Sequence, residues 1–122
     1  MADRTLVWHI PKGLWKNVEG ENVSTEYVLD DDYLPVRVHM SQKEAQAGAA
    51  TIVDINQDGV SIFPSTTLQP ALAQGLLTSE WDVFLSTLGV MQEGGVITLD
   101  VDQVSVTVPG SKLTVSLELE KA

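Results

Sequence analysis

The stretch Thr51–Phe63, TIVDINQDGVSIF, decides how the rest of the chain is interpreted. It consists of two runs rich in β-branched residues, separated by the polar tip Asn56-Gln57-Asp58-Gly59. An Asp-Gly pair between two alternating apolar segments is the strongest short-range signal for a β-hairpin, because glycine adopts a positive φ angle freely and aspartate tolerates one. The stretch therefore predicts two antiparallel strands joined by a tight turn.

The register of this hairpin follows from which residues must share a face. A two-residue loop at Asp58-Gly59 places Ile55 opposite Ile62, whereas a four-residue loop places Ile55 opposite Val60. A three-residue loop would mix apolar and polar residues on each face, so it is disfavoured. Both remaining registers give an apolar face of Val53, Ile55, Val60 and Ile62 and a polar face of Asp54, Asn56 and Ser61. We expect Ile55 and Ile62 to be buried and the polar face to be solvated.

Length and composition indicate one globular domain over residues 1–122. The chain has 43% hydrophobic and 20% charged residues, which is ordinary for a folded protein. A chain of this length can bury about two-thirds of the surface that its unfolded form exposes. No apolar run approaches the roughly 18 residues that a membrane helix needs, and the apolar patch near the N-terminus is too short for a signal peptide. We therefore expect synthesis in the cytoplasm without export by that route.

The charge balance and the absence of cysteine limit the possible partners and chemistries. Seventeen acidic residues against seven basic ones leave the chain at −10. This excess argues against binding to nucleic acid and to anionic membranes, because both demand a basic face. Since the chain has no cysteine, disulfides, cysteine zinc sites and thiol catalysis are excluded.

Period-two alternation of apolar residues predicts several strands besides the hairpin. Expected strands cover Thr5–Ile10, Ser24–Leu29, Pro35–Met40, Glu80–Leu88, Val96–Gln103 and Lys112–Glu120. Pro11 should end the first of these, which we place at a sheet edge, because proline cannot donate to a ladder. In the strand that begins at Pro35, we expect Val36, Val38 and Met40 to face inward.

The connections complete the prediction of the fold. Ser41–Ala50, SQKEAQAGAA, is the one segment that favours a helix, and we expect one or two helical turns there. Pro64–Ser79 should be a loop with a short extended piece. The sum is about seven or eight short strands with at most one short helix, without alternating β and α elements. This pattern predicts an antiparallel β-sandwich, either jelly-roll or immunoglobulin-like.

A partial calcium-binding motif lies in the hairpin. Asp54-x-Asn56-x-Asp58-Gly59 matches the opening half of an EF-hand loop. The second half fails, because Ser61 stands where an apolar residue belongs and Ser65 stands where a bidentate glutamate is needed. Turn and surface roles explain these residues better than a metal site.

Other polar residues also favour surface roles over chemistry. Asp100 and Asp102 share one strand face, roughly 7 Å apart along the chain, but no third feature supports a glycosidase carboxylate pair. His9 and His39 lie on the polar phase of their strands, which indicates a surface position rather than a zinc site. The sequence has no nucleophile elbow, phosphate loop or dinucleotide motif. We expect no catalytic, metal or cofactor site, and no enzyme.

Large apolar residues in the expected loops indicate an interface. Trp8 is in phase with the apolar side of its strand, so it should belong to the core. Trp15 lies in a loop and suits a protein interface, ordinary packing or, as a third reading, a platform for sugar rings. A soluble monomer has little reason to display such groups. The candidate interface residues are Leu14, Trp15, Leu76 and Leu77.

Most of the chain resembles a module of bacteriophage virion proteins. The resemblance rests on TIVDINQDGVSIF, QPALAQG, EGGVITLDVDQV and KLTVSLELE, and on the opening VWHIP. The module's members have a VDIN-NGTSIF hairpin, a PTI-AAG segment, an ITLDIDQIG strand and a final LTV-L strand. This chain departs from them in having VSVTVPGSK where a glycine-rich loop is usual, and in a longer stretch over residues 64–82. All of these motifs are structural, and none is catalytic.

The resemblance implies a part of the virion, because such modules occur in tail fibres, receptor-binding regions and other accessory virion proteins. The chain carries no collagen-like, coiled-coil or enzymatic segment, so we expect a separate surface subunit that decorates the capsid. A tail-fibre or baseplate component with receptor binding is the alternative, and a carbohydrate-binding module is the rival from another class. The expected partners are other virion proteins and further copies of the chain, with a trimer favoured by resemblance to phage appendages.

Overall fold

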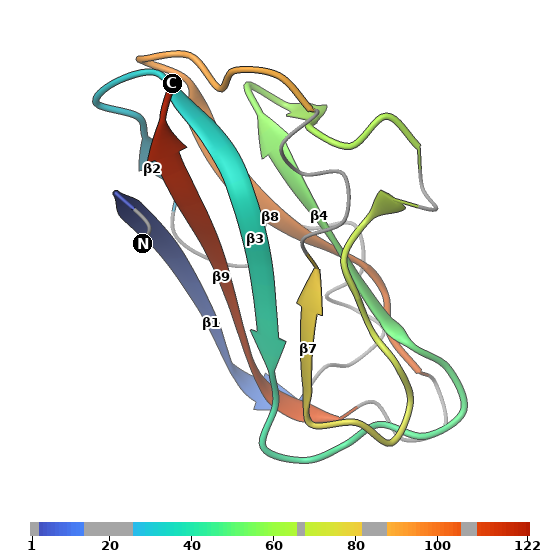
Figure 1. Cartoon of the computed structure of the whole chain (residues 1–122). Coiled ribbons are helices and arrows are strands. Elements are labelled where there is room, and N and C mark those ends of the chain that lie inside the picture. Colours follow the sequence, from blue (N-terminus) through green and yellow to red (C-terminus); the bar gives the residue numbers. More distant parts are fainter. Residues whose placement is uncertain (1–2, 14–25, 66–67, 82–87, 106–109) are drawn as a thin grey trace.

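Two antiparallel β-sheets form the computed structural model, which describes residues 3–13, 26–65, 68–81, 88–105 and 110–122 (Figure 1). The first sheet has the order β1 (Arg4–Gly13), β9 (Ser111–Lys121), β3 (Tyr33–Ser41), β7 (Thr78–Trp81). The second has the order β2 (Tyr27–Val28), β8 (Val96–Gln103), β4 (Thr51–Gln57), β5 (Val60–Ser61), and β6 (Ala71–Leu72) also pairs with β4. The described part of the chain contains no α-helix. The predicted all-β sandwich is confirmed.

One hydrophobic core lies between the two sheets, and alternate residues of the long strands supply it. β1 contributes Leu6, Trp8 and Ile10, β8 contributes Ile97, Leu99 and Val101, and β9 contributes Leu113, Val115, Leu117 and Leu119. Each of these residues is at most 6% exposed. Side chains of a strand point to opposite faces in turn, so this alternation places one face of each sheet against the other. These residues are the apolar positions of the period-two alternation that predicted the three strands.

The central hairpin has the shorter of the two predicted loops. Gln57 pairs with Val60 around Asp58 and Gly59, whose φ angles are 51° and 83°. The amide of Ile62 donates to the carbonyl of Ile55 at 3.0 Å, so these two residues face each other as predicted. Ile55 is fully buried and Ile62 packs partly buried against the core, but Val60 is 70% exposed because it extends beyond the end of the core.

The helix expected over Ser41–Ala50 is wrong. The segment is irregular and contains no helical turn, and Glu44 forms an isolated bridge with Ser111. The side-chain amide of Gln42 donates to the carbonyl of Leu76 at 2.8 Å, and that of Gln46 donates to the carbonyl of Leu72 at 2.6 Å. Two buried glutamines therefore tie this segment to the loop before β7, and these tertiary contacts override a weak helix propensity.

Strand boundaries differ from the predicted ones in several places. β1 is an edge strand as expected, but it continues past Pro11 to Gly13 after a shift of register. Val36 is only partly buried, because an irregularity between Pro35 and Arg37 changes the phase of β3. Of the strand predicted over Ser24–Leu29, Tyr27–Val28 form the short β2, and residues 24–25 lie outside the described residues. Of the strand predicted over Glu80–Leu88, the first two residues belong to β7 and residues 82–87 lie outside the described residues.

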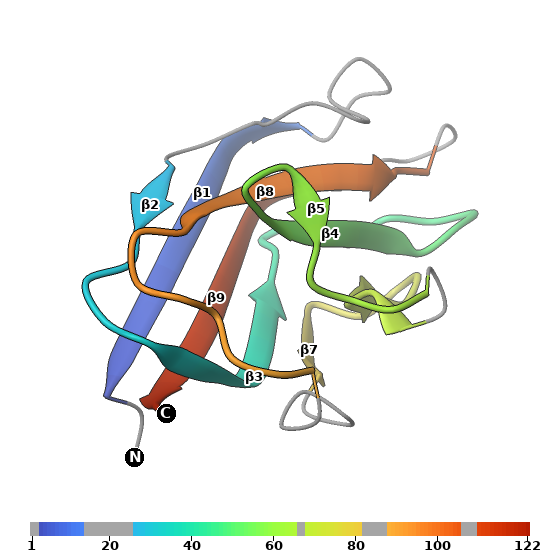
Figure 2. The ribbon, with the colours of Figure 1, turned by 90° about the horizontal axis from the view of Figure 1, so that it is seen from above.

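Tyr27 joins the two sheets at the edge of β1. Its hydroxyl donates to the carbonyl of Val7 at 2.6 Å and accepts from the amide of Val7 at 3.3 Å. Its ring meets the ring of Trp8 edge-on, with the ring centroids 5.5 Å apart. Seen from above, β2 lies beside β1 (Figure 2). The Tyr27 hydroxyl thus hydrogen-bonds to the backbone amide and carbonyl of Val7, which lie in the middle of the exposed edge of β1.

Candidate interaction surfaces

Two of the predicted interface residues, Leu76 and Leu77, form an exposed apolar turn between β6 and β7. Their exposed fractions are 52% and 50%. The turn is held by its backbone: the carbonyl of Leu77 accepts from the amide of Gln42 at 2.9 Å, and the amide of Gly75 donates to the carbonyl of Gln46 at 2.9 Å. The other two candidates, Leu14 and Trp15, lie outside the described residues. We call Leu76 and Leu77 the apolar turn.

Two exposed lysines lie near the apolar turn. Lys43 follows Gln42, whose amide bonds to the turn, and the amide of Lys43 donates to the carbonyl of Ser111 at 3.1 Å. Lys112 follows Ser111 and is also exposed. Within the described part of the chain, neither lysine forms an ion pair. The exposed carboxylate of Glu44 lies beside them and accepts from the Ser111 hydroxyl at 2.7 Å, so this end combines exposed leucines with two lysines and one glutamate.

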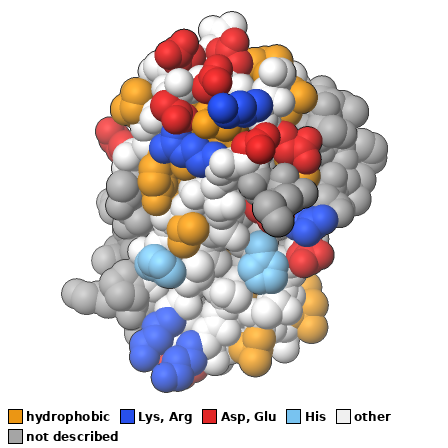
Figure 3. Space-filling model, turned by 60° about the vertical axis from the view of Figure 1, so that its left-hand side comes forward, with side chains coloured by type: hydrophobic (Ala, Val, Ile, Leu, Met, Phe, Trp, Pro, Cys, Tyr) orange, Lys and Arg blue, Asp and Glu red, His pale blue; other side chains and the backbone are white. Residues whose placement is uncertain are grey.

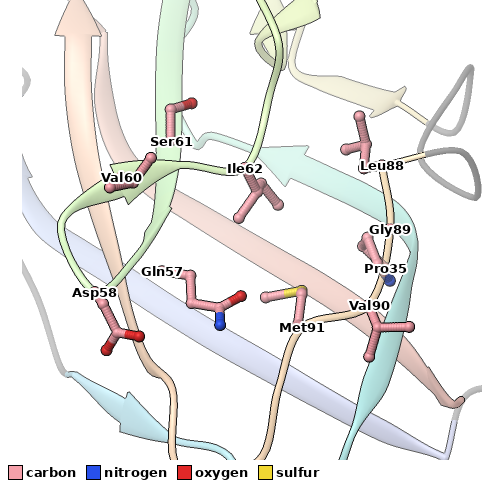
Figure 4. Close-up of a pocket in the computed structure, with 10 residues that line it drawn as sticks. All are labelled: Pro35, Gln57, Asp58, Val60, Ser61, Ile62, Leu88, Gly89, Val90 and Met91. Atoms are coloured by element: carbon pink, nitrogen blue, oxygen red, sulfur yellow. The ribbon is translucent and has the colours of Figure 1, made fainter.

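A groove of about 430 Å³ lies at the tip of the hairpin, between β5, the start of β3 and the segment that follows residue 87. Its walls carry Val60, Ile62, Leu88 and Val90, and Met91 lies at its base (Figure 4). Val60 is 70% exposed and Val90 is 49% exposed, whereas Met91 is 2% exposed. We call this cavity the hairpin groove; it exposes the open end of the core to solvent.

One acidic residue lines the hairpin groove, and two more flank segments that line it. The Asp58 carboxylate lines it and accepts a hydrogen bond from the amide of Val96 at 3.0 Å. The Asp32 carboxylate accepts from the amide of Glu93, two residues after Met91, at 2.8 Å. Asp32, Asp58 and Glu93 are exposed, and none of them forms an ion pair with a described residue. The groove is therefore lined by both apolar and polar side chains, among them Gln57, Asp58 and Ser61, and it lies next to carboxylates that form no ion pair with a described residue.

The apolar turn and the hairpin groove lie at opposite ends of the sandwich. Pro35, near the start of β3, lines the groove, and Ser41, at its end, pairs with Thr78 next to the turn. β4 spans the same distance, about 20 Å for seven residues. In Figure 3, acidic side chains gather at one end of the molecule with basic side chains among them, and a further pair of basic side chains lies at the other end.

Three carboxylates gather on the outer face of the second sheet. Asp54 lies directly opposite Asp100 on β8 and accepts a hydrogen bond from the Ser61 hydroxyl at 2.6 Å. The side-chain amide of Asn56 donates to the Asp100 carboxylate at 2.7 Å. Asp54 is 8% exposed and Asn56 is 6% exposed. The expectation that this polar face is solvated is wrong for these two residues.

The chain after the hairpin accounts for the burial of Asp54. It returns alongside β4, where the carbonyl of Pro70 accepts from the amide of Val53 at 3.1 Å, and the neighbouring Gln69 side chain hydrogen-bonds to Asp102. Burial raises the pKa of Asp54, and the negative charges of Asp102 and Asp100 raise it further against the effect of the Ser61 hydrogen bond. Burial also raises the pKa of Asp102. Hydrophobic periodicity alone gives no sign of a loop covering this face.

The remaining predicted polar sites lie at the surface. His9 is exposed and bonds to the Thr114 hydroxyl at 2.9 Å, and His39 lies 3.8 Å from the Glu80 carboxylate. Among the described residues, no group of three or more His, Cys, Asp or Glu side chains is arranged to hold a metal ion. No helix among them is long and apolar enough to cross a membrane.

The tryptophans in the described residues are not exposed platforms. Trp8 is fully buried in the core, as predicted. Trp81 is partly buried, and its indole nitrogen donates to the carbonyl of Leu68 at 3.0 Å. A flat aromatic surface for sugar rings would need an exposed ring, so these two residues do not supply one.

Comparison with known proteins gives a likeness of fold. No protein-family model matches the sequence, and no curated protein matches it. Among solved structures, a chain from the capsid of Ralstonia phage GP4 is similar, with a TM-score of 0.57 and 12% sequence identity. The superposition covers 100% of this chain and 87% of that chain. At this identity the likeness concerns the fold, which the two chains share over nearly their whole lengths.

Proposed function

We propose that this protein is a non-enzymatic structural protein of a bacteriophage virion and, more narrowly, a surface subunit that decorates the capsid. The observation that carries the proposal is the likeness of fold, over the whole chain, to a chain from a phage capsid. The sequence resemblance to virion modules supports the same class independently, because it rests on local motifs rather than on the fold. Together they favour a role in assembly.

The surface chemistry supports contact with proteins. The apolar turn and the hairpin groove expose leucine and valine side chains near charged groups that form no ion pair with a described residue. Protein interfaces combine such apolar centres with polar rims. The acid-rich composition disfavours the nucleic acid inside a capsid as a partner. A position on the outside of the virion is consistent with both features.

Binding to purified capsids tests the proposal. Phage capsids that lack this protein are mixed with the purified chain and sedimented, and the bound protein is counted per capsid. We expect saturable binding with a fixed number of copies, because a decoration protein occupies symmetry-related sites. An unrelated acidic protein of similar size serves as the control. Absence of capsid binding contradicts the proposal, and binding to tails alone supports the tail component instead.

The proposal includes assembly into trimers. Three copies are what the resemblance to phage appendages implies, and static light scattering of the purified protein measures the mass directly. A mass of three chains of 13.2 kDa is expected at working concentrations. A strict monomer, both free and on the capsid, would overturn this part of the proposal.

A further inference from the structure

We propose that the apolar turn of one copy docks into the hairpin groove of a second copy, so that copies associate head to tail. The inference concerns contacts between copies and does not depend on which part of the virion they join. It rests on the chemistry of two surfaces on the same molecule. One is an apolar projection beside two lysines and one glutamate, and the other is a groove with apolar walls that also has polar side chains and the acidic residue Asp58 in its lining.

The apolar parts of the two surfaces match in kind. The walls of the hairpin groove include valine, leucine and isoleucine side chains around a buried methionine. The volume of the groove, about 430 Å³, is large enough for branched side chains such as those of Leu76 and Leu77. Docking would remove Val60 and Val90 from water together with the two leucines. Burial of apolar surface is the main driving force of association. Both surfaces are exposed in the isolated chain, so docking removes apolar area from water on each of them.

The charges of the two surfaces are opposite. Lys43 and Lys112 outnumber the one carboxylate beside them, that of Glu44, at the end that carries the apolar turn. At the other end Asp58 lines the groove, and Asp32 and Glu93 flank segments that line it. None of these six residues forms an ion pair with another described residue. Other carboxylates on the molecule do have such partners: Asp30 pairs with Arg4 at 2.7 Å and Glu118 pairs with Arg37 at 3.6 Å. Complementary charge selects the orientation of an encounter and disfavours wrong pairings.

The proposed head-to-tail contact is heterologous, because it joins two different surfaces. Because the two surfaces lie at opposite ends of β3 and β4, one copy cannot bring its turn to its own groove. A contact between unlike surfaces leaves a free turn and a free groove at the two ends of a dimer. Addition of further copies then continues until the chain of contacts closes into a ring. A cyclic trimer is one such closed ring.

The apolar turn is already held in one conformation by hydrogen bonds. Its two carbonyls accept from the side-chain and backbone nitrogens of Gln42, and the Leu76 amide donates to the carbonyl of Ala73 at 3.1 Å. The hairpin groove is likewise fixed at its base, where the amides and carbonyls of Met91 and Tyr33 bond reciprocally at 2.7 and 2.9 Å. Less conformational entropy is lost when preformed surfaces bind.

Variants that disable one surface at a time test the contact. Val60→Asp places a carboxylate on the wall of the groove, and the double variant Leu76→Ser with Leu77→Ser removes the apolar turn. Each should raise the dissociation constant for self-association at least about tenfold, as measured by analytical ultracentrifugation. Val28→Asp is the matched control, because Val28 is 61% exposed on β2 and belongs to neither surface. Equal effects of Val28→Asp and Val60→Asp would overturn the proposal.

Mixing the two disabled variants gives the sharper test. Alone, each should be monomeric, since each lacks half of the contact. An equimolar mixture should form a dimer and nothing larger, because the intact turn of the Val60→Asp variant can dock into the intact groove of the other. A mixture that stays monomeric while the wild-type protein assembles would overturn the head-to-tail contact.

Reversal of charge tests the orientation. Lys43→Glu should weaken self-association, and a second change, Glu93→Lys, should restore part of the loss. Lys121→Glu is the control, because it changes the net charge from −10 to −12 just as Lys43→Glu does. Lys121 lies at the opposite end of the molecule, beside Asp31. Equal weakening by the two single variants would contradict the proposal. These measurements need no capsid, so their failure is distinguishable from failure of capsid binding.

Discussion

At the scale of single residues, burial in the fold disfavours the ionised form of the Asp54 side chain. Its pKa is raised chiefly by burial, so the folded state binds a proton there more readily than the unfolded chain does. Above the raised pKa, ionised Asp54 therefore destabilises the fold, and this penalty is lost as the pH falls through that pKa towards the ordinary carboxyl value. Asp54→Asn should raise the free energy of unfolding at pH 7, because the amide carries no charge and its oxygen can still accept from Ser61.

The comparison across pH checks this prediction. Urea denaturation of both proteins at neutral and at acidic pH should show that the advantage of Asp54→Asn shrinks as the pH falls. Asp31→Asn removes one negative charge from an exposed loop and serves as the control. A variant that is less stable than the wild type at pH 7 would show that the carboxylate makes contacts that outweigh its burial.

Tyr27 is a second residue for which we predict an effect on stability, through its hydroxyl oxygen. Tyr27→Phe keeps the ring against Trp8 but removes the hydroxyl that bonds to both the carbonyl and the amide of Val7. The loss should lower the free energy of unfolding by about 1 kcal/mol, the usual net value of a hydrogen bond. It should also open the middle of the β1 edge to pairing with other chains. Unchanged stability in chemical denaturation would contradict this role.

At the scale of elements, the hairpin contains both a fully buried and a highly exposed apolar residue, Ile55 and Val60. Ile55→Ala should lower the free energy of unfolding by about 2–5 kcal/mol, because it leaves a cavity in a fully packed core. Val60→Ala, five residues later in the same hairpin, is the control and should change stability by less than about 0.5 kcal/mol. Val60 is 70% exposed. Equal effects of the two substitutions on thermal or urea unfolding would mean that the faces of the hairpin are assigned wrongly.

The same element shows how far sequence reasoning extends. Turn chemistry and alternation predicted the register of the hairpin, because Asp58-Gly59 and the facing isoleucines constrain it locally. They did not predict that Asp54 is buried, since the covering segment is distant in sequence and has no period of its own. The absence of a helix over Ser41–Ala50 was not predicted for the same reason, namely that the cause is distant in sequence. Gln42 and Gln46 hydrogen-bond to residues beyond position 70, and such tertiary contacts leave no local pattern.

The candidate surfaces divide in the same way. Leu76 and Leu77 were predicted as exposed interface residues from their place in a loop rich in proline and glycine, and the structure places both at the surface. The hairpin groove was not predicted, because it joins β5, the start of β3 and the segment around Met91, which no local pattern connects. Val60 was assigned to the core face, and its exposure follows from its position beyond the last core layer.

At the scale of the whole molecule, net charge should oppose assembly while the proposed contact favours it. Each copy carries −10, and the repulsion between two such copies acts over the Debye length, which falls from about 30 Å at 0.01 M salt to about 8 Å at 0.15 M. The contact between the apolar turn and the hairpin groove acts at short range and depends mainly on apolar burial, so salt weakens it less. Self-association should therefore strengthen as salt rises over this range.

Sedimentation at several salt concentrations measures this dependence, and a variant of lower charge supplies the control. Glu80→Gln with Glu120→Gln changes the net charge from −10 to −8 at two exposed positions that line neither surface. It should associate more tightly at low salt and respond less to added salt, because less repulsion remains to be screened. If the wild-type protein instead dissociates as salt rises, attraction between the lysines and the acidic residues near the groove outweighs the repulsion, and the balance argued from net charge is wrong.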